Sequence, residues 1–256
     1  MSIIFGPAGL GSAKTAVKVL EEYSKKGFEA CEIAFVHGAY IKPEDTKQIK
    51  EAAEKYGISF SIHAPYYVNL GSIEKEKRDK SRERILQCCE IGEMLGVRTV
   101  VFHPGYYQES KEETYKTVKK EVELMLEYIK KKKWKIEIAP EIMGKVNVFG
   151  SLDEISRLAK ETGCAFCIDF AHLLARDKKV NYKEVEKAFP QKKWHVHFSG
   201  IVYGDKGEKH HKPTESKEWK ELLQNLPKDK EIVIINESPN MIEDSIDGIK
   251  IYHKIN

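Results

Sequence analysis

Histidine, aspartate and glutamate gather at the downstream ends of short apolar segments. Eight of the nine histidines, all but His253, lie at or beyond the C-terminal half of such a segment. Imidazole and carboxylate groups gathered in one place carry a large desolvation cost unless cations compensate it. Such donors, without thiolate, suit zinc, manganese or iron, and they outnumber what one tetrahedral ion needs, which predicts more than one ion. The candidate donors are His63, His103, Glu141, Asp169, His172, His195, His197, Glu208, His210, His211 and Glu237.

The elements that must position these residues alternate along the whole chain. Each β-branched, apolar run is followed by a segment with helix punctuation, and we count eight runs and eight helices. Ser12 and Gly27 are expected to bound the first helix, Pro43 and Gly57 the second. Capping boxes are expected at Ser151, Asn181 and Asn240, and helix ends at Gly96 and Gly163. The strand candidates are residues 2–8, 30–36, 59–65, 98–104, 135–141, 165–171, 194–200 and 231–237.

Eight units in 256 residues leave about 32 residues each, which is typical of an α/β fold of the (β/α)8 TIM barrel type. A doubly wound open sheet is the alternative, but FGPAGLG after the first strand is a poor match to its glycine fingerprint. No linker or composition shift divides the chain, so we predict one barrel domain over residues 1–256. In such a barrel, catalytic groups lie at the C-terminal ends of the strands, where the candidate donors fall.

Composition excludes some classes of protein. No apolar run approaches the roughly 20 residues of a membrane span, and the N-terminus does not resemble a secretory signal. The 43 basic and 40 acidic residues give a net charge of +3, which neither demands nor forbids nucleic acid. Five cysteines argue against a disulfide framework, and we expect a cytoplasmic protein. Cys167 is expected in the barrel core.

Six motifs in order resemble the endonuclease IV family of apurinic/apyrimidinic endonucleases, which are trinuclear zinc TIM barrels within the xylose isomerase-like group. They are HAPYYVNLGS, VFHPG, APE, CIDFAH, HFSG followed by EKHH, and NESP, between residues 59 and 239. The resemblance implies two to three Zn²⁺ ions, with Mn²⁺ as the other candidate. It also implies double-stranded DNA with abasic sites as the partner. We expect no membrane association and a monomer.

The resemblance assigns the candidate donors to three ions. His63 and His103 are expected to hold one ion, and Glu141 to bridge it to a second. Asp169, His197 and Glu237 complete the second site. His172 is expected to hold the third ion with Glu208 and either His210 or His211, because the EKHH segment can be aligned in two ways. His197 is preferred to His195, which is expected to point into a deeper layer of the barrel.

The implied reaction is hydrolysis of the phosphodiester 5′ to an abasic site, leaving a 3′-hydroxyl. Glu141 and Glu237 are the expected catalytic carboxylates, and Glu237 is also a candidate for proton movement. The abasic nucleotide is expected to flip out of the duplex. Tyr66 matches a family tyrosine that packs at the damaged nucleotide. His37 and Tyr40 are candidates to wedge into the duplex or, alternatively, part of a packed loop, because GPAGLGSAK and AFVHGAYIK lack the family's usual Arg, Gln or Asn.

Two other functions use the same residues. Sugar isomerases and epimerases of the xylose isomerase-like group bind one divalent ion through a set that Glu141, Asp169, His197 and Glu237 would supply. Such an enzyme has no need of the additional histidines, which favours the nuclease. A metal-stabilised nucleic-acid-binding protein without catalysis is the third hypothesis, and it leaves an open metal site without a purpose.

Overall fold

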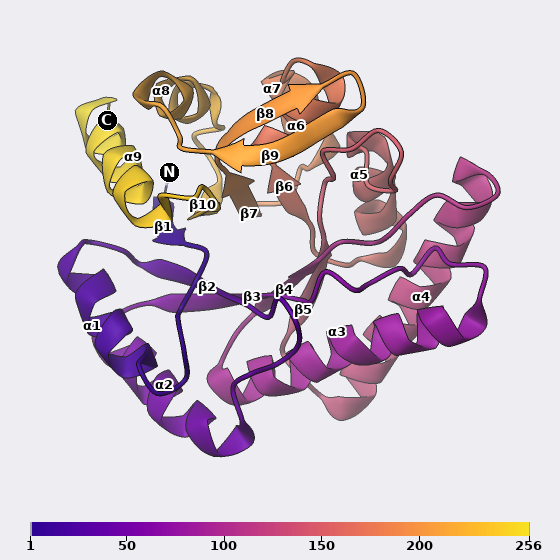
Figure 1. The fold of residues 1–256 in the computed structure, drawn as a ribbon, viewed down its shortest axis with the longest axis horizontal. Coiled ribbons are helices and arrows are strands. Elements are labelled where there is room, and N and C mark those ends of the chain that lie inside the picture. Colours follow the sequence, from indigo (N-terminus) through magenta and orange to yellow (C-terminus); the bar gives the residue numbers. More distant parts are fainter. Residues whose placement is uncertain (1, 256) are drawn as a thin grey trace.

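Eight parallel strands form a closed barrel in the computed structural model, which describes residues 2–255 (Figure 1). Two four-stranded sheets, β1-β10-β7-β6 and β2-β3-β4-β5, are joined by the bridges Ala8–Glu32 and Glu141–Cys167. The predicted (β/α)8 barrel is confirmed. The barrel strands are β1 (Ser2–Pro7), β2 (Ala30–Ala34), β3 (Ser59–His63), β4 (Thr99–Phe102), β5 (Glu137–Pro140), β6 (Cys167–Asp169), β7 (Lys193–Phe198) and β10 (Glu231–Asn236).

Helices surround this barrel. Most of their ends lie at the capping residues and glycines expected from the sequence. Gly57, Gly96 and Gly163 adopt the left-handed conformation after their helices, as predicted, and Ser151 forms a capping box with Glu154. The helices are α1 (Ala16–Lys25), α2 (Pro43–Tyr56), α3 (Lys75–Leu95), α4 (Lys111–Lys132), α5 (Leu152–Thr162), α6 (Phe170–Asp177), α7 (Tyr182–Ala188), α8 (Ser216–Asn225) and α9 (Met241–Ile255).

The start of the first helix was predicted wrongly. Ser12 does not cap α1, because a turn precedes the helix: the backbone N–H of Thr15 donates to the carbonyl of Ser12 at 3.0 Å. Their hydroxyl groups also lie 3.0 Å apart. The helix itself begins at Ala16, with Thr15 at the cap position.

Two further elements depart from eight simple units. Helix α6 begins directly after β6, because Asp169 caps it by accepting from the backbone N–H of His172 at 2.7 Å. Helix α7 then follows before β7, so the described residues contain nine helices instead of eight. After β7, the chain forms an antiparallel hairpin of β8 (Gly200–Gly204) and β9 (Gly207–Lys212), which lies beside α6 at the barrel mouth (Figure 1).

Side chains along the barrel strands point alternately outward, towards the helices, and inward, to the interior of the barrel. Residues such as Ile62 and Val196 belong to the large core between the barrel and its helices. Val101, Ala139 and Cys167 form a small apolar cluster of their own inside the barrel, which confirms Cys167 as a core residue. All five cysteines are buried and free. Within residues 2–255, no helix has both the length and the apolar character to cross a membrane.

Candidate metal centre

Six potential ligands meet at one end of the barrel because parallel strands place their C-terminal ends together. His63 and Asp169 are the last residues of β3 and β6, and His197 lies near the end of β7. The other three follow directly after their strands. The six residues are His63, His103, Glu141, Asp169, His197 and Glu237.

Glu141 lies at the centre of these side chains and is fully buried. Its Oε2 lies 3.2 Å from Nε2 of His63 and 3.0 Å from Nε2 of His103. Its Oε1 lies 3.2 Å from Nδ1 of His172 and 3.4 Å from Nδ1 of His197. One carboxylate therefore faces two groups of histidines through different oxygens, the arrangement expected of a residue shared by two ions.

The hairpin brings a further group to the same mouth. Oε2 of Glu208 lies 3.4 Å from Nε2 of His172, and Oε1 lies 3.9 Å from Nε2 of His211. Nδ1 of His211 lies 2.7 Å from the hydroxyl of Ser199. Glu208, His172 and His211 offer ligand atoms within 4.8 Å of one another, so this group is as close-set as the one around Glu141.

Backbone carbonyls orient two of the histidines. Nδ1 of His63 lies 2.7 Å from the carbonyl of Ala64, and Nδ1 of His172 lies 2.9 Å from that of Ile142. A carbonyl only accepts, so each Nδ1 donates, and Nε2, which faces Glu141 in His63 and Glu208 in His172, is the nitrogen that would bind an ion once its own proton is lost. Metal-binding histidines in proteins are typically held in this way.

The structure fits metal ions because several buried polar atoms lack hydrogen bonds. They include Oε1 of Glu141, Oδ2 of Asp169 and Nδ1 of His197. Buried polar atoms are normally satisfied, so unsatisfied atoms at one place indicate a missing partner. Three sets of ligand atoms, each within 4.8 Å, converge here: His63, His103 and Glu141; Glu141, Asp169, His197 and Glu237; and His172, Glu208 and His211.

Electrostatics also indicate a shortage of positive charge. Burial raises the pKa of Glu141, but His103 and the other histidines outweigh it and hold this pKa well below its ordinary value. Burial lowers the pKa of His63, but Glu141 outweighs it and raises the net pKa to about 9. Burial raises the pKa of Asp169. Protons on histidines thus balance buried carboxylates, a balance that cations would provide when bound.

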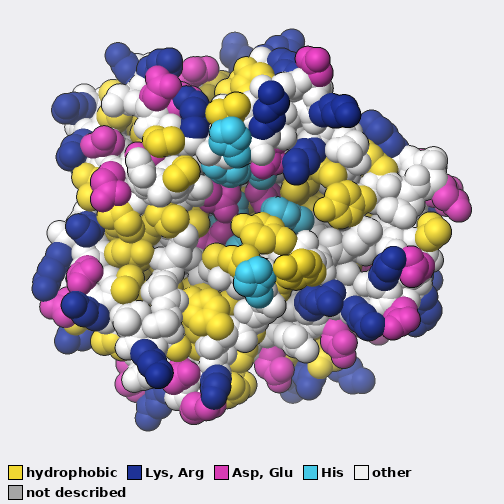
Figure 2. Space-filling model, in the orientation of Figure 1, with side chains coloured by type: hydrophobic (Ala, Val, Ile, Leu, Met, Phe, Trp, Pro, Cys, Tyr) yellow, Lys and Arg dark blue, Asp and Glu magenta, His cyan; other side chains and the backbone are white. Residues whose placement is uncertain are grey.

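A cleft of about 540 Å³ opens above these groups. Figure 2 shows histidine and acidic side chains in the central hollow of this face, with apolar side chains beside them and Lys and Arg around the periphery. Tyr66, Tyr106 and Lys145 line the cleft with His63, His103 and Glu237. The ligand groups are therefore accessible from solvent through an amphipathic entrance.

A family model described as a xylose isomerase-like TIM barrel matches residues 20–253. The chain belongs to this family. A xylose isomerase-like barrel fits the closed parallel sheet and the position of the ligand groups at its C-terminal mouth.

Relatives of this xylose isomerase-like barrel include nucleases. It is 35% identical to an uncharacterized protein of Methanocaldococcus jannaschii, covering 99% of this chain and 98% of the relative. It is 30% identical to an apurinic-apyrimidinic endonuclease of Caenorhabditis elegans over 69% of this chain and 49% of that protein, so it spans about half of the nematode enzyme. The resemblance to endonuclease IV is thus confirmed at the level of relatives that include apurinic-apyrimidinic endonucleases.

Solved structures of two functional classes share the fold. Endonuclease IV of Thermus thermophilus superposes with a TM-score of 0.76 at 21% identity, covering 98% of each chain. A 3-keto-D-glucoside 4-epimerase of E. coli superposes with a TM-score of 0.75 at 12% identity, covering 99% of this chain and 100% of the epimerase. At these identities the structures establish the fold alone.

The structure distinguishes the two candidates in the hairpin. His211 joins His172 and Glu208, whereas His210 is exposed and lies outside that group. The physical reason is a bulge: Tyr203 pairs with Glu208 and Val202 with His210, which leaves Lys209 as an extra residue. The bulge places Glu208 and His211 on one side, although their odd spacing would separate them in a regular strand. His210 is therefore the predicted metal ligand that the structure does not bring to the site.

The predicted substrate-binding residues lie at different depths. Tyr66 is 52% exposed, lines the cleft, and has its ring 5.5 Å from that of His63. His37 lies on the β2–α2 loop, where its Nδ1 is 3.3 Å from the hydroxyl of Tyr67. Tyr40 packs edge-on against Phe35. Tyr66 is thus within the site, while His37 and Tyr40 lie outside the cleft lining.

Glu32 was missed by the sequence analysis. It lies in β2, is fully buried, and its Oε2 lies 3.0 Å from Nε2 of His195. His195 therefore occupies the deeper layer expected for it. The signal was a single acidic residue within the apolar run ACEIAF. Glu32 precedes the end of its strand by two residues, so it does not belong to the pattern of donors at strand ends.

Proposed function

We propose that this protein is a zinc-dependent phosphodiesterase that incises double-stranded DNA on the 5′ side of an abasic site and leaves a 3′-hydroxyl. The observation that carries the proposal is the sharing of Glu141 between two histidine groups, with the His172, Glu208 and His211 group beside them. Donors sufficient for more than one ion suit phosphodiester hydrolysis, where charge develops on several oxygens.

The ligand residues would hold the ions in three sets with Glu141 common to two. When bound, clustered zinc ions would activate water and stabilise the charge on the phosphate and its leaving group. Glu141 would fix the separation of the sets, because its two oxygens face different histidines. Glu237 would contribute an accessible carboxylate from the cleft wall, where it can accept a proton.

The cleft mouth is suited to a flipped sugar and its flanking phosphates. Tyr66 and Tyr106 are 52% and 53% exposed, and both line the cleft with Lys145. Burial, with smaller contributions from Glu237 and Glu141, raises the pKa of Tyr66 to about 12, so its hydroxyl stays protonated near neutral pH and can donate to a phosphate or sugar oxygen. An abasic nucleotide is cheap to flip because it has no base pair to break.

The β2–α2 and β3–α3 loops offer the duplex a second contact. The rings of His37 and Tyr67 are stacked with centroids 6.1 Å apart, and Tyr67 is 60% exposed. Exposed aromatic rings next to a flipping site can stack on the bases that flank the gap. His37 is thus proposed to act with Tyr67, and Tyr40 to support the loop through Phe35.

A one-metal sugar epimerase is the second candidate, supported by the group of Glu141, Asp169, His197 and Glu237 and by the epimerase neighbour. That function leaves His63, His103 and the hairpin group without a role. The position of these additional donors beside Glu141 and His172 favours the phosphodiesterase.

Incubation of the zinc-loaded protein with a duplex that contains one abasic analogue tests the proposal. We expect a single cut 5′ to the lesion, and a DNA polymerase should extend the product because it carries a 3′-hydroxyl. An intact-base duplex serves as the control substrate. Epimerisation of a keto-sugar by the same protein, together with no cleavage, would replace the proposal by the second candidate.

A further inference from the structure

A buried polar network lies directly beneath the candidate ligands. Oε2 of Glu32 accepts from the hydroxyl of Ser61 at 2.7 Å and lies 3.0 Å from Nε2 of His195. Oε1 of Glu32 lies 2.9 Å from Nε2 of His197, and both residues are fully buried. Neither of these two atoms has a hydrogen bond within residues 2–255, so the pair is a close contact of two buried polar atoms whose angle falls outside hydrogen-bond geometry.

His197 faces the ligand set through its opposite nitrogen. Its Nδ1 lies 3.4 Å from Oε1 of Glu141 and 3.5 Å from Oε1 of Glu237. A carboxylate only accepts hydrogen bonds, so a hydrogen bond from His197 to Glu32 would need the proton on Nε2. Nδ1 is then left with a lone pair on the side of Glu141 and Glu237.

We propose that Glu32 is a positioning residue that fixes the Nε2–H form of His197 and aims Nδ1 at an ion held with Glu141, Asp169 and Glu237. This inference rests on the metal centre of the proposed function. A carboxylate behind a metal-binding histidine orients the ring and raises its basicity. Glu32 comes from β2, which supplies no member of the three ligand groups, so it adds a strand to the site.

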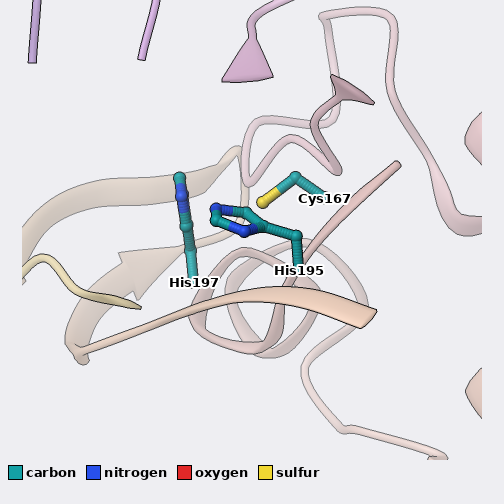
Figure 3. Close-up of side chains that lie close together, drawn as sticks. All are labelled: Cys167, His195 and His197. Carbon is teal, nitrogen blue, oxygen red and sulfur yellow. The ribbon is translucent and has the colours of Figure 1, made fainter. Parts of the chain in front are cut away.

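His195 and Cys167 lie next to His197 inside the barrel. Figure 3 shows the ring of His195 and the sulfur of Cys167, from β7 and β6, directed towards His197. The ring centroids of His195 and His197 are 5.3 Å apart. Cys167 packs with Val101 and Ala139 inside the barrel, and His195 directs Nε2 at Glu32. Both residues thus support the pair of Glu32 and His197.

Glu32→Gln tests the proposal without a change of shape. The amide oxygen can still accept from Ser61 and His195, and the NH2 group then faces Nε2 of His197. That nitrogen would have to accept, which moves the proton to Nδ1 and removes the ligand. We expect affinity for one zinc ion to fall about 10- to 100-fold in chelator competition, with the remaining ions unaffected.

Glu121→Gln is the matched control. Glu121 is also a buried carboxylate, but it pairs with Arg78 and Arg82 between α3 and α4, away from the histidines. This variant should change thermal stability and leave every zinc affinity as in the wild type. Equal zinc affinities for Glu32→Gln and the wild type would overturn the positioning role alone. Absence of zinc binding by the wild type would overturn both this role and the metal centre.

A measurement on the unaltered protein keeps the test valid if Glu32→Gln does not fold. Long-range ¹⁵N–¹H spectra of the zinc-loaded wild type report which ring nitrogen of each histidine carries hydrogen. We expect the His197 signal to show a proton on Nε2 and a ligated Nδ1. A proton on Nδ1 would overturn the proposal.

Discussion

At the scale of single residues, Glu141 is the side chain whose loss should affect the site most. Glu141→Gln keeps the shape of the side chain but removes the charge that two histidine groups share. We expect the rate of abasic-site incision to fall by at least about 100-fold, with loss of zinc, while circular dichroism shows a retained fold. Glu137→Gln, at the exposed opposite end of β5, is the control and should behave as the wild type. Unchanged turnover in Glu141→Gln would refute the shared-ligand assignment.

The two adjacent hairpin histidines provide an internal comparison. His211→Gln should lose about one equivalent of zinc, because His211 lies with His172 and Glu208. His210→Gln should retain all of its zinc, because this side chain is exposed and outside the group. Elemental analysis of the two purified variants measures both outcomes. The reverse result would mean that the β8–β9 register differs from the one described.

Residue types predicted most of the site, and the limits of that prediction have physical causes. Histidines and carboxylates at strand ends could be assigned because all parallel strands end at the same mouth. The choice between His210 and His211 depends on the bulge at Lys209, which the letters EKHH do not encode. Glu32 acts from below the mouth, and its partner His195 is 163 residues away in sequence.

At the scale of elements, the docking of the β8–β9 hairpin completes the third group of ligands. The backbone N–H of Glu208 donates to the carbonyl of Gly144 at 3.1 Å. Gly207 beside it has φ of +92°, and a Cβ there would lie 2.1 Å from the same carbonyl oxygen. The hairpin can therefore approach the β5–α5 loop only because residue 207 lacks a side chain.

Gly207→Ala should displace the hairpin and weaken zinc binding by the His172, Glu208 and His211 group. Chelator competition should show about a 10-fold or greater loss for one ion and no change for the others. Gly204→Ala is the matched control in the same hairpin, because its Cβ would meet only the flexible end of Lys209. If Gly207→Ala binds zinc as the wild type does, hairpin docking does not position the group.

The elements themselves were predicted where local signals and the fold agree. Apolar runs followed by helix caps and terminal glycines gave the eight barrel strands, with shifts of a few residues at their ends. Helix α6 was not predicted, because Asp169 is both the last residue of β6 and the N-cap of α6, so no loop separates the two elements. The hairpin was not among the predicted elements, because EKHHK is polar and β8 and β9 form a sheet separate from the barrel.

At the scale of the whole molecule, bound metal should contribute to stability. The buried carboxylates and unsatisfied atoms around Glu141 favour a state in which cations are present. Zinc that binds the folded chain and not the unfolded chain raises the free energy of unfolding when it is in large excess over its dissociation constant. Removal of metal with a chelator should lower the melting temperature by about 5 °C or more in differential scanning calorimetry. Added zinc should restore it, and an unchanged melting temperature would count against metal as part of the folded centre.

The response to salt separates the two functional classes. DNA binding releases counterions, so raising salt from about 50 to 200 mM should weaken binding of an abasic duplex by at least about 10-fold. Fluorescence anisotropy at several salt concentrations gives the slope. Binding of a neutral keto-sugar should barely respond. A flat salt dependence for DNA would indicate that phosphates are not contacted.

The number of metal ions per chain tests the central claim most directly. Protein purified without added chelator should contain two to three zinc ions by elemental analysis, because three groups of ligands converge on the mouth of the barrel and two share Glu141. One ion per chain, with manganese in place of zinc and turnover of a keto-sugar, would contradict the account and assign the site to an epimerase.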